Sequence, residues 1–221
     1  AFLFSGQGAQ YKDMGRELYD NYEEAKNIFN KANEVLGIDL KKIIFEKEDE
    51  LNKTENTQPA ILTMSIAALE VLRKQGIEAE AVAGLSLGEY SALIASGALT
   101  FEEGVALVRK RGKFMQEAVP EGRGSMVAVI GLSKEKLQEA CKYGSDFGVV
   151  EIANYNTKEQ MVIGGEVEAV TKAAEKAKEL GAKRAIPLTV SGPFHTSLLK
   201  PAAEKLRKEL ENVNFYETKI P

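Results

Sequence analysis

The pentapeptide Gly84-Leu85-Ser86-Leu87-Gly88 contains the residues with the clearest chemical potential in this sequence. It has the form G-x-S-x-G, follows a short apolar run (79–83) that we interpret as a buried strand, and precedes a helical pattern. The two glycines permit a tight, strained turn that lifts the Ser86 hydroxyl out of the sheet. The helix behind the turn points free N–H groups at the same place. Two interpretations follow: a serine nucleophile beside an oxyanion site, or a chance occurrence of common residue types.

A serine nucleophile needs a base, and His195 is the single histidine of the chain. It lies in a turn-rich segment (191–196) before a helical pattern. If an imidazole activates Ser86, His195 must supply it. The alternative is that His195 is an ordinary surface or core residue. No aspartate can be assigned from the sequence as the third member of a triad.

Two further segments could bind charge. The glycine-rich loop Gly6-Gln7-Gly8 follows the first apolar strand and lacks the Lys-Ser/Thr of a phosphate-binding P-loop. It is either a plain turn or a source of a backbone N–H for an oxyanion. Four cations cluster late in a predicted helix. They either form a solvated face or include one arginine that turns inward and binds a carboxylate. They are Arg109, Lys110, Arg111 and Lys113.

The elements that must position these residues fall into two groups. In the first, strands, glycine turns and helices alternate, which predicts a parallel sheet with covered faces. One of its helices is predicted at 60–73, with Thr57 as its cap and Pro59 at its start. After a hinge at 120–124 the order is β-α-β-β-α-β, which is the ferredoxin-like signature. We therefore predict a core of 1–120 and 190–221 with an insert of 121–189.

Composition excludes several functional classes. The 221 residues include 29 Lys+Arg and 33 Asp+Glu, which give a net charge of −4. The sequence contains no run of basic residues interleaved with aromatic residues, so it does not predict nucleic-acid binding. Apolar stretches are too short for a membrane span. One cysteine and one histidine exclude a zinc site built on those residues. With a single cysteine and no signal peptide at the start, we predict a cytoplasmic protein. The chain begins inside a strand and stops as another begins, so we expect a fragment of a longer chain.

Five segments in order resemble those of the malonyl-CoA:acyl carrier protein transacylase family of dissociated fatty acid synthesis. They are GQGAQ (6–10), TQPA (57–60), GLSLGEY (84–90), RGKFMQEAVPEGRGSM (111–126) and GPFHT (192–196). The resemblance runs from residue 2 to residue 221. It implies an α/β-hydrolase-like parallel-sheet core with an inserted ferredoxin-like subdomain.

The resemblance also implies roles for particular residues. Ser86 is the acylated nucleophile and His195 the general base and acid. Gln7 and Leu87 supply the two N–H groups of the oxyanion hole. Arg111 pairs with the free malonyl carboxylate.

Three more positions are carried over from the family. Phe194 is the bulky residue that the family associates with malonyl at this position. Asn154 and Asn156 resemble cleft positions near the acyl and pantetheine chain. The substrates are malonyl-CoA, a coenzyme A thioester, and acyl carrier protein, which brings its own phosphopantetheine. No bound cofactor and no metal is expected, and we expect a monomer.

The sequence departs from the family at two places. Leu85 stands where many members carry a histidine, which leaves His195 as the sole imidazole. The family's chain also continues beyond Pro221 with a glutamine segment whose backbone carbonyl orients the catalytic histidine. Without a replacement for that segment, we expect the tautomer of His195 to be poorly fixed.

Three alternatives share parts of this prediction. A serine hydrolase or thioesterase would use Ser86 and His195 but release its acyl group to water. A non-catalytic module would bind acyl-CoA or a carrier protein without serine acylation. An acyltransferase domain excised from a polyketide synthase is the third, although the 111–126 segment looks more like the discrete enzyme.

Overall fold

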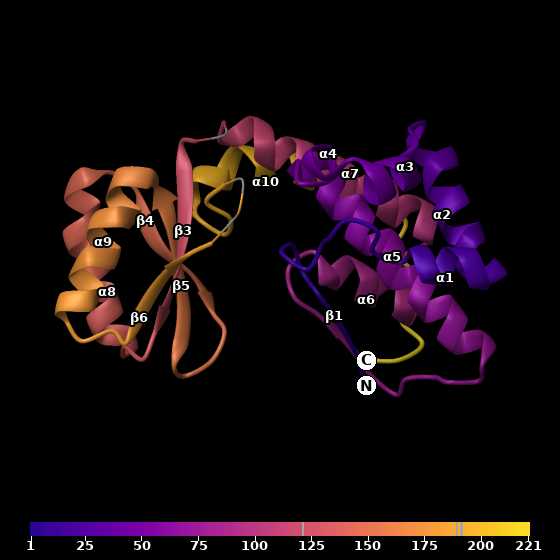
Figure 1. The fold of residues 1–221 in the computed structure, drawn as a ribbon, viewed down its shortest axis with the longest axis horizontal. Helices are drawn as coiled ribbons and strands as arrows, with labels where there is room; N and C mark the ends of the chain where they lie inside the picture. Colours follow the sequence, from indigo (N-terminus) through magenta and orange to yellow (C-terminus); the bar gives the residue numbers. More distant parts are fainter. Residues whose placement is uncertain (121, 189, 191) are drawn as a thin grey trace. The chain divides into compact units, whose positions relative to one another are not determined.

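The structure, a computed structural model, describes residues 1–120, 122–188, 190 and 192–221 (Figure 1). The chain splits into two compact units: unit 1 is Ala1–Lys113 with Leu206–Pro221, and unit 2 is Phe114–Lys205. The predicted ends of the insert, Glu121 and Thr189, lie outside the described residues, as does Ser191 in the segment that returns from the insert.

Unit 1 combines a two-stranded parallel sheet with helices. β1 (Phe2–Phe4) pairs in parallel with β2 (Val82–Gly84), as the alternation of strands and helices predicted. The helices are α1 (Arg16–Asn21), α2 (Glu23–Leu36), α3 (Leu40–Glu46), α4 (Glu48–Leu51), α5 (Thr54–Lys74), α6 (Gly88–Ser96) and α7 (Phe101–Ala118), which continues into unit 2. The C-terminal residues return to β2, where the Val82 N–H donates to the carbonyl oxygen of Pro221 at 2.8 Å.

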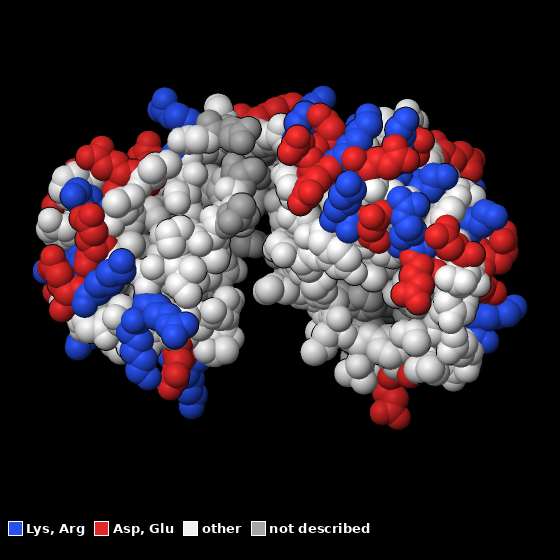
Figure 2. All heavy atoms as spheres, viewed as in Figure 1, with Lys and Arg blue, Asp and Glu red and all other residues white. Residues whose placement is uncertain are grey.

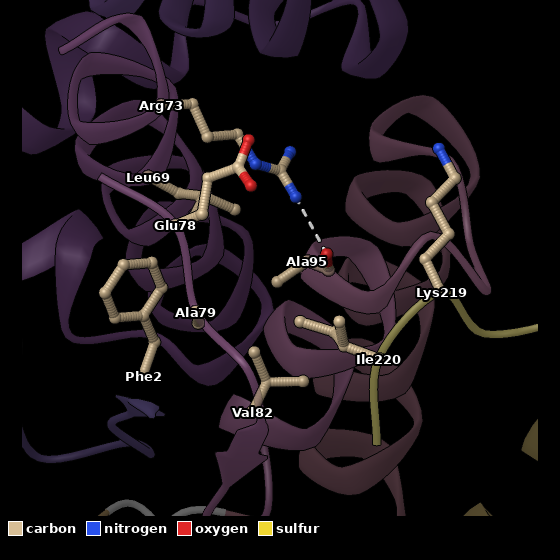
Figure 3. A pocket seen from close by; sticks show the side chains of 9 residues that line it. All are labelled: Phe2, Leu69, Arg73, Glu78, Ala79, Val82, Ala95, Lys219 and Ile220. Carbon is tan, nitrogen blue, oxygen red and sulfur yellow. Dashed lines mark hydrogen bonds between the residues drawn. The ribbon is translucent and has the colours of Figure 1, made fainter. Parts of the chain in front are cut away.

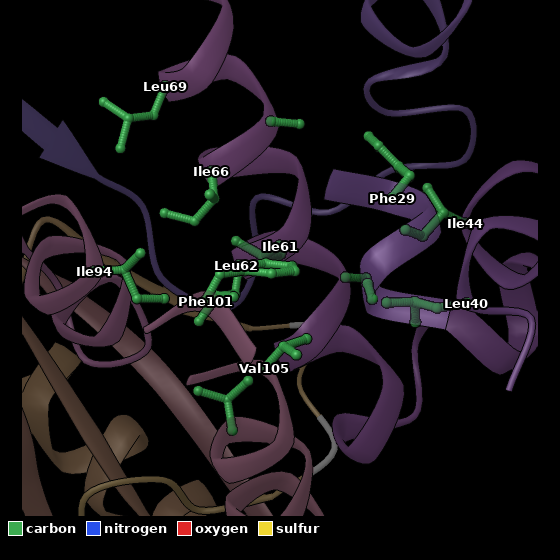
Figure 4. Packing of buried hydrophobic residues seen from close by; sticks show 14 of the residues in the cluster. Phe29, Leu40, Ile44, Ile61, Leu62, Ile66, Leu69, Ile94, Phe101 and Val105 are labelled. Carbon is green, nitrogen blue, oxygen red and sulfur yellow. The ribbon is translucent and has the colours of Figure 1, made fainter. Parts of the chain in front are cut away.

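Helix α5 is the centre of unit 1. Most of its residues are buried, and Leu62 is fully so. Figure 4 shows Leu62 beside Phe101 and Val105 of α7, with Phe29 of α2 among the neighbouring buried residues. A helix that buries apolar residues on most of its circumference is typical of a core element, so α5 organises the helices that carry the site.

The start of α5 differs from the sequence prediction. The helix begins at Thr54, not near Ala60, and Thr57 is not its cap. The Thr57 hydroxyl instead lies within hydrogen-bond distance of two backbone carbonyl oxygens, those of Leu51 at 2.5 Å and Lys53 at 3.0 Å. Pro59 lies inside the helix, where it lacks the N–H that would bond to the residue four positions earlier. The first turns are buried against the rest of unit 1, and this tertiary contact outweighs the local signal of the proline.

Unit 2 has the ferredoxin-like order predicted from the sequence. Its strands and helices are β3 (Gly124–Ile130), α8 (Lys134–Gly144), β4 (Val150–Tyr155), β5 (Gln160–Glu166), α9 (Val167–Glu179), β6 (Arg184–Pro187) and the first residues of α10 (Lys200–Leu210). The antiparallel sheet has the order β4-β5-β3-β6. Helices α8 and α9 cover one of its faces (Figure 1). Ser133 caps α8 as expected, accepting a hydrogen bond from the Lys136 N–H.

The limits of unit 2 are wider than the predicted insert of 121–189. Met115 of α7, Phe194 and Ala202 of α10 form one hydrophobic cluster with Met126 of β3. This cluster lines the face of the sheet that α8 and α9 leave open, so the end of α7 and the start of α10 group with unit 2. Among the described residues, no helix is long and apolar enough to cross a membrane.

Replacing Gly88 with alanine is expected to destabilise the protein strongly. A Cβ at Gly88 would collide with the backbone carbonyl of Phe4, which cannot yield without moving β1. Overpacking of this kind costs about 1–3 kcal/mol or more. Ala92→Gly, the reverse change within α6, is the control and should cost about 1 kcal/mol through helix propensity alone. Thermal unfolding followed by circular dichroism compares them, and equal shifts in Tm would contradict the packing argument.

Candidate active site

Ser86 occupies a sharp turn between β2 and α6. Its φ is 55°, a left-handed conformation that is uncommon for a residue other than glycine. The Leu85 N–H donates to the carbonyl of Phe4 at 3.1 Å, and the Gly88 N–H donates to the carbonyl of Leu85 at 2.9 Å. Strained residues of this kind cluster at functional sites. The strand–turn–helix predicted from G-x-S-x-G is therefore present.

Three glycines allow backbones to meet at this turn. A Cβ on Gly84 would collide with the backbone of Gly88, and a Cβ on Gly88 would collide with that of Phe4. A Cβ on Gly6 would lie 2.7 Å from the carbonyl oxygen of Leu85. The glycine-rich loop after β1 thus lies directly against the turn that carries Ser86.

This arrangement places two backbone donors near the turn. Leu87 directly precedes α6, whose N-terminus carries the positive end of the helix dipole. In the described part of the chain, the N–H groups of Leu87 and Gln7 have no hydrogen-bond acceptor. The Gln7 side chain donates to Thr54 Oγ1 at 3.3 Å, which ties the glycine-rich loop to α5. Free N–H groups beside a nucleophile are what an oxyanion site requires.

Arg111 is the cation of the α7 cluster that contacts Ser86. Its Nη2 donates to Ser86 Oγ at 3.0 Å, and its Nη1 donates to Gln58 Oε1 at 2.7 Å. The guanidinium carbon lies 5.6 Å from the centre of the Tyr90 ring. Gly112 makes this possible, since a Cβ there would lie 2.5 Å from the carbonyl oxygen of Thr54 and would push α7 away from α5.

The other three cations of the cluster are engaged elsewhere or exposed. Arg109 donates to the carbonyl of Leu36 at 3.0 Å, and Lys110 forms an ion pair with Glu209 at 2.7 Å. Lys113 is exposed. The spacing left open which of these four cations turns inward. In the structure, Arg111 is the one among them that contacts Ser86.

Arg111 is a partly buried cation without a carboxylate partner in the described part of the chain. Burial lowers the pKa of its guanidinium, and the nearby Tyr90 and Glu89 oppose that shift. Burial likewise raises the pKa of Tyr90, so its ring meets the guanidinium as a neutral phenol. A buried charge is costly unless it is paired. The planar fork of Arg111 can supply that pair by binding a carboxylate through two hydrogen bonds.

His195 lies in unit 2, in the turn between β6 and α10, and its φ is 61°. Its neighbours fix this turn. Phe194 is buried, and the Thr196 hydroxyl donates to the carbonyl of Pro193 at 2.7 Å. The Ser197 N–H donates to Glu151 Oε2 on β4, also at 2.7 Å. A strained histidine with an exposed side chain is thereby presented by an anchored backbone.

The remaining predicted residues also belong to unit 2. Phe194 packs into the cluster around Met126. Asn154 is half-buried on β4 next to an irregularity in the pairing with β5. Asn156 is exposed in the β4–β5 turn, where its backbone N–H donates to the carbonyl of Gln160. The structure thus brings Gln7, Ser86, Leu87 and Arg111 together in unit 1, and it places the other four in unit 2.

Sequence reasoning gave no role to Gln58, Tyr90 and Glu151. Gln58 and Tyr90 belong to segments that carry the family resemblance, TQPA and GLSLGEY, and this was the available signal. No signal pointed to Glu151, because its contact with Ser197 joins residues 46 positions apart.

Other chemistry finds little support. Burial raises the pKa of Cys141 to about 11, so its thiol stays protonated at neutral pH. Within the described residues, no group of three or more His, Cys, Asp or Glu could hold a metal ion. A cavity of about 290 Å³ lies between β2, α5, α6 and the C-terminal residues. Figure 3 shows Arg73 reaching from its edge to the carbonyl oxygen of Ala95, and its lining includes none of the predicted site residues.

The chain matches the family model of the acyl transferase domain over residues 1–221. It is 50% identical to the malonyl CoA-acyl carrier protein transacylase of Bacillus subtilis and 46% identical to that of Escherichia coli K12. These alignments cover 100% of this chain, but 70% and 72% of the two relatives.

Solved structures give the same result. The crystal structure of MCAT from Streptococcus pneumoniae is 55% identical, with a TM-score of 0.94 over 100% of this chain and 72% of that one. A malonyl-transacylase in complex with its type II polyketide synthase acyl-carrier protein is 44% identical, with a TM-score of 0.95 over the same shares. The chain therefore has the α/β acyltransferase fold, an α/β-hydrolase-like core with a ferredoxin-like insert.

The anchor of the His195 turn can be tested by hydrogen exchange. In Glu151→Ala the Ser197 amide loses its acceptor and should exchange faster, by roughly 10- to 100-fold for a bond to a charged group worth about 1.5–3 kcal/mol. Glu151→Gln keeps an acceptor oxygen and should lie between that variant and the parent. The rates can be measured by NMR. An unchanged rate in Glu151→Ala would show that this carboxylate does not hold the turn.

Proposed function

This chain belongs to the acyl transferase domain family and, within it, to the malonyl CoA-acyl carrier protein transacylases, and we propose that it transfers the malonyl group of malonyl-CoA to the phosphopantetheine thiol of acyl carrier protein in fatty acid biosynthesis. The observation that carries the proposal is the hydrogen bond between Arg111 and Ser86. It joins a nucleophile in a strained turn to a partly buried cation that suits an acyl group ending in a carboxylate.

In the first half-reaction His195 takes the proton of the Ser86 hydroxyl, and Oγ attacks the thioester carbonyl of malonyl-CoA. Before malonyl binds, Oγ accepts a hydrogen bond from Arg111, so its single proton is directed toward another acceptor. The N–H groups of Gln7 and Leu87 stabilise the oxyanion, and losing one such donor costs roughly 3 kcal/mol in the barrier. The C–S bond then breaks, coenzyme A leaves as a thiol with the proton from His195, and the malonyl ester remains on Ser86.

In the second half-reaction the phosphopantetheine thiol of acyl carrier protein attacks the malonyl ester. His195 takes the thiol proton and returns it to Ser86 Oγ as the ester C–O bond breaks. The products are malonyl-carrier protein and the free serine. One imidazole thus acts as base and acid in each half of a ping-pong cycle, which is consistent with the single histidine of the chain.

Arg111 selects the acyl group in this proposal. When malonyl binds, its carboxylate takes the guanidinium from Ser86 and Gln58, and each charged hydrogen bond is worth roughly 1.5–3 kcal/mol. An acetyl group offers no such partner. Phe194 crowds a 2-methyl substituent and so disfavours methylmalonyl relative to malonyl, by only about 1–3 kcal/mol. Asn154 and Asn156 contact the acyl and pantetheine chain.

The serine hydrolase and thioesterase alternative uses the same nucleophile but discharges the ester to water. The family relationship does not favour it, nor does it favour a non-catalytic binding fragment. We further propose that the protein acts as a monomer in the cytoplasm. Its proposed reaction needs no bound cofactor, because coenzyme A and phosphopantetheine arrive with the two substrates.

Serine acylation should be visible by intact-protein mass spectrometry after brief mixing with malonyl-CoA. We expect a gain of one malonyl group, its absence in Ser86→Ala, and its loss when acyl carrier protein is added. Ser91→Ala is the matched control, since Ser91 is a buried serine of α6 and should leave the adduct intact. An adduct that persists in Ser86→Ala would contradict the assignment. An adduct that is released to water as fast as to carrier protein would favour the hydrolase.

Arg111→Ala should separate malonyl from acetyl transfer. Losing two charged hydrogen bonds to the carboxylate, about 3 kcal/mol or more together, should reduce malonyl transfer by roughly 100-fold or more, since 1.4 kcal/mol is a factor of ten. Acetyl transfer should fall far less, so the malonyl-to-acetyl ratio of kcat/KM decreases. Arg109→Ala, on the same helix but bonded to Leu36, should leave that ratio unchanged. An equal loss for both acyl groups in Arg111→Ala would mean that Arg111 is structural.

A further inference from the structure

The loop that follows β1 is held by side chains rather than by its own backbone. Among the described residues, none of the N–H groups at 7–10 donates to a backbone carbonyl. The Gly8 N–H donates instead to Oε1 of Gln10 at 2.8 Å. Gly8 has a φ of 108° and no Cβ, so its own side chain does not restrict the peptide. The bond to Gln10 therefore contributes directly to keeping this loop in one conformation.

Gln10 links this loop to the connection between α4 and α5. Its side chain is half-buried, and its Nε2 donates to Oδ1 of Asn52 at 3.2 Å. Asn52 is the C-cap of α4, where its backbone N–H donates to the carbonyl of Glu48 at 3.1 Å. The two ends of the Gln10 amide thus bind different segments, the loop and the end of a helix. We call Gly8, Gln10 and Asn52 the amide bridge.

The amide bridge completes a set of contacts around Gln7. The Gln7 side chain donates to Thr54 Oγ1 at 3.3 Å, on the same connection that the bridge reaches. Before Gln7 in the chain, Gly6 packs against the carbonyl oxygen of Leu85. After it, the peptide N–H of Gly8 is held by the bridge. Gln7 is therefore fixed through its side chain and on both sides along the backbone, which limits rotation of its own N–H group.

The α4–α5 connection also contacts the helix that carries Arg111. A Cβ on Gly112 of α7 would lie 2.5 Å from the carbonyl oxygen of Thr54. The connection thus touches the loop of one proposed oxyanion donor and the helix of the cation proposed for the carboxylate. A donor stabilises a developing charge best when it is oriented before the reaction begins, because reorientation during the reaction costs free energy. The amide bridge supplies such orientation for the Gln7 N–H.

We propose that Gln10 is a positioning residue for acyl transfer. Its side-chain amide holds the Gly8 peptide to the end of α4 and thereby orients the Gln7 N–H toward the oxyanion that forms on the thioester carbonyl. Gln10 acts through Gln7 and does not contact the substrate. This inference rests on the proposed function, because it needs the Gln7 N–H to stabilise the transition state of that reaction. It adds a residue outside the turn of Ser86 on which the rate of acylation depends.

Gln10→Met removes both hydrogen bonds at nearly constant side-chain length. The rate constant of Ser86 acylation at saturating malonyl-CoA should fall by roughly three- to tenfold, the range that one neutral hydrogen bond is worth. The affinity for malonyl-CoA, measured in Ser86→Ala with and without Gln10→Met, should stay within about twofold, because the oxyanion develops only after attack. Lys12→Met, at an exposed position of the same loop, is the matched control and should acylate at the parent rate.

Gln10→Glu should restore most of the parent rate. One carboxylate oxygen can accept from the Gly8 N–H, and the amide of Asn52 can rotate to donate to the other. The added charge enters a surface of mixed sign, since Figure 2 shows Lys, Arg, Asp and Glu side chains interspersed over the upper part of unit 1, where Figure 1 places α3 and α4. A carboxylate that failed to restore the rate would show that the acceptor for Gly8 is not what the reaction requires, and would overturn the inference.

Hydrogen exchange at the Gly8 amide, followed by NMR, separates the geometry from the reaction. In Gln10→Met this amide should exchange faster than in the parent, and in Lys12→Met it should not. An unchanged exchange rate in Gln10→Met would show that Gln10 does not hold the loop. Faster exchange with a parent rate of acylation would show that the held loop does not orient the donor. Either result would overturn the inference.

The remaining outcomes distinguish the positioning role from the proposed function. A loss of malonyl-CoA affinity in Gln10→Met as large as its loss of rate would mean that the loop binds the ground state, and would overturn the inference alone. Absence of an acyl-serine in the parent protein would contradict the proposed function itself. Asn52→Ala should slow acylation as well, and adding it to Gln10→Met should cause little further loss, because both changes break the same bridge. Fully additive losses would overturn the inference.

Discussion

The site of this protein depends on one close approach between backbones, that of Gly88 to Phe4. Because no Cβ stands between them, α6 begins directly against β1, and the chain must pass through Ser86 in a left-handed conformation. The same geometry leaves the Leu87 N–H, at the start of α6, without an acceptor among the described residues, and it brings the Gly6 loop against Leu85. The strand, the strained nucleophile and the oxyanion donors are thus consequences of a single packing constraint.

The second constraint is electrostatic. Arg111 is held as a partly buried cation by Gln58, Ser86 and the ring of Tyr90, none of which is a carboxylate. Neutral partners satisfy its N–H groups without cancelling its charge, so the desolvation cost is offset only in part. A substrate carboxylate completes the pairing. The selectivity proposed for malonyl follows from a charge that is partly buried and that has no carboxylate partner among the described residues.

Local signals allowed much of this to be predicted. The turn at Ser86 was predictable because glycine spacing determines turn geometry, and the ferredoxin-like insert because its strands and helices have clear periodicity. The predicted start of α5 was wrong, because burial of the first turns of the helix outweighs the helix-breaking tendency of Pro59. Residue spacing could not predict that Arg111 rather than Arg109 contacts Ser86, because this depends on which face of α7 packs against α5. The contact of Glu151 with Ser197 joins two distant segments, and the limits of unit 2 follow from a cluster formed by α7, β3 and α10.

The most direct test of this mechanism is a crystal structure of the malonyl ester on Ser86, obtained by soaking with malonyl-CoA in the absence of carrier protein. We expect the malonyl carboxylate to accept hydrogen bonds from both terminal nitrogens of Arg111, with Gln58 displaced from Nη1. We also expect the ester carbonyl oxygen to accept from the N–H groups of Gln7 and Leu87. A carboxylate that points into solvent while Arg111 remains bonded to Gln58 would contradict the proposal that the partly buried charge of Arg111 selects the substrate.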